Sequence, residues 1–128
     1  MATKIVLVGH CGADSSYLRI AVSGAAKNAS VVMADDEGSL KKEIDEGVAL
    51  LLVNRVLDYG FKTDEGVELI RQLHTEHPAL KMMLVSNHAD AHAAAVAAGG
   101  LPGFGKRQIG SPQVKEIIRA AIGEVVSE

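Results

Sequence analysis

The stretch Ala49-Leu-Leu-Leu-Val-Asn54 decides the fold of this chain. Five consecutive apolar residues are typical of a strand that is buried on both faces, as the strands of a parallel sheet are. The run stops at a polar residue, Asn54, which is therefore expected at the carboxyl end of the most hydrophobic strand. Polar residues at that end of a parallel strand are where a functional site is sought.

Strand-like and helix-like segments alternate on both sides of this run. Further strands are expected at residues 4–8, 30–33, 81–85 and 103–105. Helical spacing of apolar residues predicts helices from Asp14 or Ser15 to Ala25 and over residues 38–46, 64–75, 89–98 and 112–125, with a loop at 55–63. Asp14 or Ser15 could cap the first helix, and Ser111 is the expected N-cap of the last helix, before Pro112.

Five strands alternating with five helices predict an α/β fold, a doubly wound parallel sheet covered on both faces, in a single domain over residues 1–128. The carboxyl ends of the strands then bring together six positions and their neighbours: His10, Cys11, Asn54, Ser86, Asn87 and Lys106.

Composition excludes several classes of function. The net charge is −3 with no basic stripe, so direct binding to nucleic acid is not expected. No apolar run approaches the ~20 residues of a membrane-spanning helix, and the N-terminus has no signal-peptide pattern. The single cysteine, Cys11, cannot form an internal disulfide, so the cytoplasm is the expected location.

Through four motifs spread along its length, the chain resembles the receiver domain of response regulators. The motifs are VGH after the first strand, LLLVN at the third, MMLVSNHAD at the fourth and AAAVAAGGLPGFGK leading into the fifth. The resemblance implies a CheY-like (flavodoxin-like) sheet in the order 2-1-3-4-5. It also implies a phosphorylation site in which Asn54 stands at the phosphoacceptor aspartate, while Ser86 and Lys106 match the family's Ser/Thr and Lys.

The chemical positions of that family are changed in this sequence. His10 and Cys11 stand about where two acidic residues would hold Mg²⁺, and two extra residues precede the first helix. Arg107 replaces the usual proline, and Phe104 lies two residues before the lysine, where the family's switching aromatic lies three before. An amide is a poor nucleophile, and Mg²⁺ prefers carboxylate oxygens. The chain thus resembles a degenerate pseudo-receiver that lacks the phosphoacceptor.

Two carboxylates could replace the missing anion. Asp14 and Asp58 could each lie near the site and pair with Lys106, and either could be a displaced phosphoacceptor. The simpler interpretation is that both are loop residues, with Asp14 a helix cap. If neither carboxylate is within reach, Lys106 is expected to extend into solvent.

Metal, thiol and nucleotide sites are weaker hypotheses. His10, Cys11, His88 and His92 could supply Zn²⁺ ligands, although scattered histidines are more often solvated or structural. Cys11 near a helix start could be a reactive thiol, but a small packed cysteine is the simpler interpretation. The stretch from Gly100 to Lys106 fits GxxxxGK, yet it follows a helix and lacks Ser or Thr, so a turn and short strand are expected.

The sequence therefore favours a stand-alone signalling module of the two-component or phosphorelay type. It would be no enzyme, need no cofactor, and bind a signalling protein or a second copy through the region of the last two helices. The alternatives are a phosphorylation switch on Asp58 or Asp14, and a metal- or thiol-based sensor or enzyme at His10 and Cys11.

Overall fold

A computed structural model describes residues 3–10, 12–26, 28–57 and 60–122. One parallel sheet contains all five of its strands in the order β2-β1-β3-β4-β5. The strands are β1 (Thr3–Val8), β2 (Ala29–Ala34), β3 (Leu50–Asn54), β4 (Met82–Val85) and β5 (Leu101–Phe104). The α/β fold class and the strand order expected from the sequence are confirmed.

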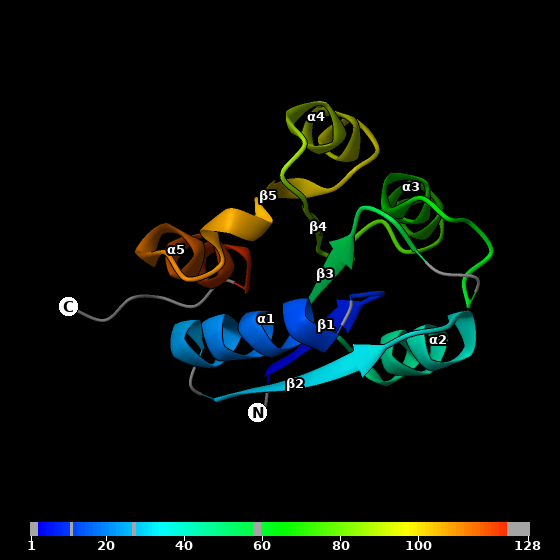
Figure 1. The fold of residues 1–128 in the computed structure, drawn as a ribbon. Helices are drawn as coiled ribbons and strands as arrows, with labels where there is room; N and C mark the ends of the chain where they lie inside the picture. Colours follow the sequence, from blue (N-terminus) through cyan, green and yellow to red (C-terminus); the bar gives the residue numbers. More distant parts are fainter. Residues whose placement is uncertain (1–2, 11, 27, 58–59, 123–128) are drawn as a thin grey trace.

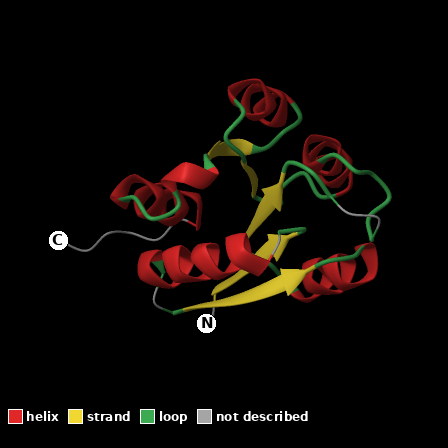
Figure 2. Cartoon of the chain, in the orientation of Figure 1, coloured by secondary structure: helices red, strands yellow, loops and turns green. Residues whose placement is uncertain are grey.

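Helices cover both faces of this sheet. They are α1 (Gly12–Ala25), α2 (Glu37–Glu46), α3 (Gly66–Glu76), α4 (Ala89–Ala97) and α5 (Pro112–Ile122), with a short 3₁₀ helix, η1 (Lys106–Gln108), between β5 and α5. Helices α1 and α5 lie side by side on one face, and α2, α3 and α4 lie on the other (Figures 1 and 2). The molecule is a three-layer sandwich.

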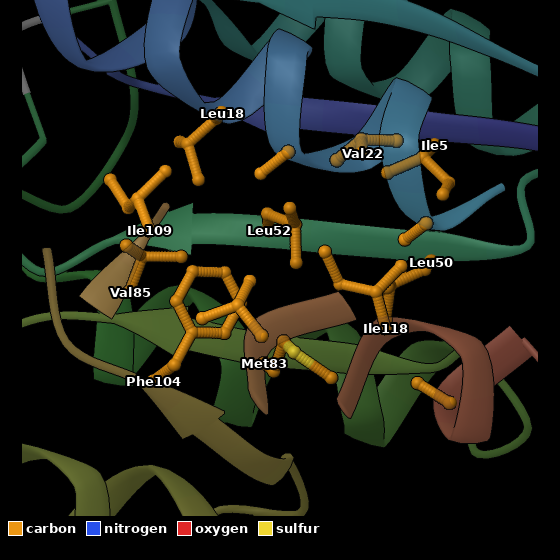
Figure 3. Packing of buried hydrophobic residues seen from close by; sticks show 14 of the residues in the cluster. Ile5, Leu18, Val22, Leu50, Leu52, Met83, Val85, Phe104, Ile109 and Ile118 are labelled. Atoms are coloured by element: carbon orange, nitrogen blue, oxygen red, sulfur yellow. The ribbon is translucent and has the colours of Figure 1, made fainter. Parts of the chain in front are cut away.

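The sheet separates two apolar clusters because successive side chains of a strand point to opposite faces. Leu50 and Leu52 of β3 pack with the cluster under α1 and α5, which Figure 3 shows around Phe104 and Ile118. Leu51 and Val53 pack with the cluster under α2, α3 and α4. Residues 50–53 have 0% exposure, so β3 is the central buried strand that its sequence predicts.

The capping residues expected at two helices are not the ones that the structure shows. Helix α1 begins at Gly12, so Asp14 lies inside its first turn, and Ser15 donates its hydroxyl to the Gly12 carbonyl at 3.0 Å. Neither residue is the N-cap, because both lie inside the helix. Helix α5 begins at Pro112 as predicted, but the buried Ser111 hydroxyl has no hydrogen-bond partner within the described structure.

Two other boundaries shift for local reasons. Helix α3 starts at Gly66 and not at residue 64, since Glu65 is held extended by an antiparallel bridge to Val56. The last strand runs over Leu101–Phe104, with Pro102 tolerated because β5 is an edge strand. The GxxxxGK stretch is thus largely a strand, as its simpler interpretation expected.

Candidate functional site

Asn54 ends β3 and joins two backbone segments. Its Nδ2 amide donates to the Gly9 carbonyl at 3.1 Å and to the Val56 carbonyl at 2.9 Å. Both partners are carbonyl oxygens, so the NH₂ group, and not Oδ1, must face them. The side chain thereby ties the end of β1 to the loop that follows β3, and both amide hydrogens are used.

That loop folds back over the end of β1. Leu57 and Phe61 are buried at 3% and 7% exposure and pack with the cluster under α2, α3 and α4. A Cβ atom added at Gly9, whose φ is +70°, would lie 2.5 Å from Leu57 Cδ2. Gly9 is therefore required both by its backbone conformation and by the close approach of Leu57.

His10 is buried directly after this turn, with 6% exposure. Its Nε2 lies 2.8 Å from the Leu52 carbonyl oxygen, so Nε2 must carry the hydrogen and Nδ1 the lone pair. Burial is the largest influence on the pKa of His10 and lowers it, the bond to Leu52 opposes this, and the nearby Lys106 charge lowers it further. The His10 imidazole is therefore neutral, and its hydrogen bond connects the end of β1 to β3.

Lys106 reaches one of the two carboxylates that the sequence offers. Its Nζ lies 3.0 Å from Asp14 Oδ2, with 33% and 25% of the two side chains exposed. The ion pair ties the start of η1 to the first turn of α1. Asp58, the other candidate carboxylate, lies outside the described residues, as does Cys11.

The residues after β4 are bonded to their own neighbourhood. The hydroxyl of Ser86, at 2% exposure, accepts from the His88 N–H at 3.1 Å, and His92 Nε2 donates to the Ser86 carbonyl at 2.6 Å. These bonds hold the start of α4 against the end of β4. Asn87 Oδ1 accepts from the Arg107 N–H at 3.1 Å and so connects this segment to η1.

Some of these side chains line a small open cavity. It measures about 200 Å³ and is formed by Arg55, Val56, Ser86, Asn87, His88 and Lys106. Its charged groups are cations, whereas an aspartyl phosphorylation site requires a carboxylate at the end of the third strand. The nearest match to that position is the neutral Asn54.

Comparison with solved structures finds the same architecture in receiver domains. NtrX from Brucella abortus superposes with a TM-score of 0.75 at 18% identity, over 96% of this chain and 28% of the NtrX chain. The isolated receiver domain of RcsB from Salmonella enterica serovar Typhimurium gives 0.74 at 14%, over 100% and 93%. A response regulator from Thermotoga maritima gives 0.71 at 19%, over 96% and 99%.

The fold is that of a receiver domain. At these identities the likeness establishes the architecture and nothing finer. No protein-family model matches the sequence, and no curated protein does either.

The receiver fold makes the position of Phe104 informative. Phe104 is buried at 2% exposure in the cluster under α1 and α5, so it is a core residue (Figure 3). The position three before Lys106 is Gly103, where an added Cβ would lie 2.0 Å from the Leu84 carbonyl oxygen. No aromatic side chain fits there without moving β5 away from β4.

The weaker metal hypothesis gains no support from the described residues. Among them no group of three or more His, Cys, Asp or Glu side chains is placed to hold a metal ion. His92 Nε2 is bonded to Ser86, and His88 is exposed at the start of α4. No described helix is both long and apolar enough to cross a membrane.

Sequence reasoning did not find Leu57, Phe61 or the hydrogen bonds of Asn54. Leu57 and Phe61 lie four residues apart in the segment Leu57-Asp-Tyr-Gly-Phe61, and this spacing predicts no particular element because a helix and a strand both allow it. Their large apolar side chains in a segment expected to be a loop were the available signal.

Proposed function

We propose that this protein is a receiver-like signalling module of the two-component or phosphorelay type that acts by binding proteins, without phosphorylation at residue 54. The observation that carries the proposal is the double hydrogen bond of Asn54, which turns the phosphoacceptor position into a structural clamp. No enzymatic activity, cofactor or resident metal is part of this function, and we place it in the cytoplasm.

Other features support a partner-binding role. The polar groups around this position already have partners within the protein: hydrogen bonds for Ser86 and His10, and an ion pair for Lys106. The groups that would respond to a phosphoryl group therefore stabilise one conformation instead. Among the similar structures, one is described as a beryllofluoride-activated NtrC4 receiver domain dimer, which shows that this fold can pair with a second copy. The partner here is a signalling protein or a second copy that contacts the region of the last two helices.

The test is incubation of the full chain with acetyl phosphate and Mg²⁺, followed by intact-mass measurement. We expect no adduct of one phosphoryl group under conditions that phosphorylate an active receiver domain run in parallel. A stable adduct on the wild-type chain would overturn the proposal.

A displaced phosphoacceptor is the second candidate, because Asp14 lies 3.0 Å from Lys106 as a phosphoacceptor would lie near the family's lysine. If an adduct forms, Asp14→Asn and Asp58→Asn identify its position: the variant that loses the adduct carries the acceptor. A metal- or thiol-based site at His10 and Cys11 is tested by elemental analysis of protein purified without a histidine tag, and by thiol titration of wild type and Cys11→Ser.

A further inference from the structure

One edge of the sheet is open to pairing with another strand. Strand β2 lies at the end of the strand order and, within the described structure, pairs with β1 alone (Figure 1). Its six residues, Ala29–Ala34, include no charged residue, proline or glycine. The opposite edge strand, β5, has four residues and carries Pro102 and Gly103. Short length and proline are common protections of an edge strand, so β5 is protected and β2 is not.

The outer side of β2 presents backbone groups of Val31 and Met33. The Ala34 carbonyl accepts from the Gly9 N–H at 3.1 Å, so it faces β1. Because backbone groups alternate in direction along a strand, those of Val31 and Met33 face away from β1. Among the described residues one hydrogen bond reaches these groups: Arg19 of α1 donates to the Val31 carbonyl at 3.0 Å. A carbonyl oxygen has two lone pairs, so Val31 can still accept from another strand.

The side chains of this edge are apolar on both faces. Val31 packs against the cluster under α1 and α5, and Val32 packs against the cluster on the other face. Met33 follows on the same face as Val31 and is 37% exposed. A second strand beside β2 would cover these side chains, and removing their apolar surface from water would stabilise the contact.

The charges beside β2 select a second copy as its occupant. Arg19 lies beside Val31, Asp35 follows the end of the strand, and both are exposed with no ion-pair partner among the described residues. Two antiparallel copies of β2 centred on Val32 would place Val31 opposite the partner's Met33. Each Arg19 would then lie about 7 Å along the strand from the partner's Asp35, within reach of a long side chain. A two-fold contact makes this match of cation and anion twice.

We infer that two copies of this chain associate by antiparallel pairing of their β2 strands, which joins two five-stranded sheets into one continuous sheet. Val31 and the partner's Met33 exchange backbone hydrogen bonds, and Arg19 pairs with the partner's Asp35. The inference goes beyond the proposed function, because it places the second copy at the edge opposite β5 and leaves the last two helices free for a signalling protein. The contact comprises one short strand and the flank of α1, so weak association is expected.

Concentration dependence tests the association and its location together. Sedimentation of the full chain at micromolar to millimolar concentrations should show a monomer–dimer equilibrium. Amide hydrogen exchange is then measured at low and high concentration. Where nine-tenths of the chain is dimeric, exchange of the Val31 and Met33 N–H groups should slow about tenfold, since the monomer alone leaves them open. The Val32 N–H faces β1 and should show no such dependence.

Charge-reversal variants test the two-fold arrangement. Arg19→Glu and Asp35→Lys each bring like charges together across the contact, so each alone should weaken association at least tenfold. An equimolar mixture of the two variants should restore it, because both contacts of a mixed dimer again join a cation to an anion. Met33→Lys should also weaken association, by adding a cation near the partner's Arg19. Lys81→Glu is the control, at an exposed position just before β4, and should change association less than twofold.

Three results would overturn the inference. One is a monomer throughout the concentration range, which would leave the edge to a strand of another protein. Another is a mixture of Arg19→Glu and Asp35→Lys that associates no better than either variant alone. The third is a dimer that Lys81→Glu abolishes and Met33→Lys does not, which would place the contact near β5. None of these results bears on acetyl phosphate labelling, so failure of this inference is distinguishable from failure of the proposed function.

Discussion

The side-chain amide nitrogen of Asn54 lies 3.1 Å from the carbonyl oxygen of Gly9, which ties the carboxyl ends of the two central strands together. The same nitrogen bonds the Val56 carbonyl, so the clamp extends to the loop that covers Gly9. The residue at the end of β3 thus has a structural role, and this has measurable consequences.

Asn54→Asp should destabilise the protein. At neutral pH it places a carboxylate against two carbonyl oxygens and removes two hydrogen bonds, for a loss of about 1–3 kcal/mol in the free energy of unfolding. The repulsion raises the pKa of the new carboxyl in the folded state. The deficit relative to wild type should therefore shrink as pH falls through that pKa, since a protonated carboxyl can donate again.

Asn87→Asp is the matched control for that substitution. Asn87 accepts through Oδ1 from the Arg107 N–H, and a carboxylate can accept there too. Urea unfolding should show a change of less than about 0.5 kcal/mol. An Asn54→Asp variant as stable as Asn87→Asp at pH 7 would mean that the clamp contributes nothing.

Lys106→Met should lower the free energy of unfolding by about 1 kcal/mol. The loss is modest because the Lys106–Asp14 pair is partly exposed, and it arises because Asp14 is left without that partner. A double-mutant cycle with Asp14→Asn isolates the interaction of the pair. A gain in stability would contradict the pairing and would indicate that Lys106 is held for an anionic ligand.

Stability should fall as the solution is acidified below the pKa of an unfolded histidine, about 6.5. Burial lowers the pKa of His10 in the folded state, so between the lowered value and 6.5 the unfolded chain binds a proton that the folded protein does not. The contribution of this residue is at most about 1.4 kcal/mol per pH unit. Urea unfolding of wild type at pH 7.5 and 5.5 measures it.

His10→Gln should remove this part of the pH dependence, whereas His77→Gln, at the exposed end of α3, should keep it. If both variants follow the wild-type pH profile, His10 is not held neutral by burial.

Gly103→Ala should destabilise the protein by about 1–3 kcal/mol, since its Cβ would overlap the Leu84 carbonyl and force β5 away from β4. Gly12→Ala is the control. Nothing lies within 4 Å of a Cβ there, and alanine in the first turn of α1 should stabilise by up to about 1 kcal/mol. Equal thermal midpoints for the two variants would contradict the packing at Gly103.

The sheet was predictable because its strands are short continuous apolar runs. The continuous apolar run at residues 50–53 is typical of a central parallel strand, and the structure buries all four residues. The same rule placed Asn54, Ser86 and Lys106 at one edge of the sheet, where they lie.

The partners of these residues were less predictable, because they depend on backbone geometry. The two hydrogen bonds of Asn54 require the loop to return over Gly9. That return depends on Leu57 and Phe61 packing into the same apolar cluster. The position of Asp14 depended on where α1 begins, and helix starts are set by local capping that several polar residues could supply. Its pairing with Lys106 was one of several possibilities that the sequence left open.

The most direct test of the central claim, that the phosphorylation site has become structural, is a chemical-shift titration with Mg²⁺ and beryllofluoride on wild type and Asn54→Asp. The account predicts no shifts localised around residues 10, 54, 86 and 106 in either protein. Asn54→Asp still lacks the acidic pair that would hold the metal, since His10 stands near that position and is bonded to Leu52. Saturable shifts at these residues in wild type with either ligand would contradict the account.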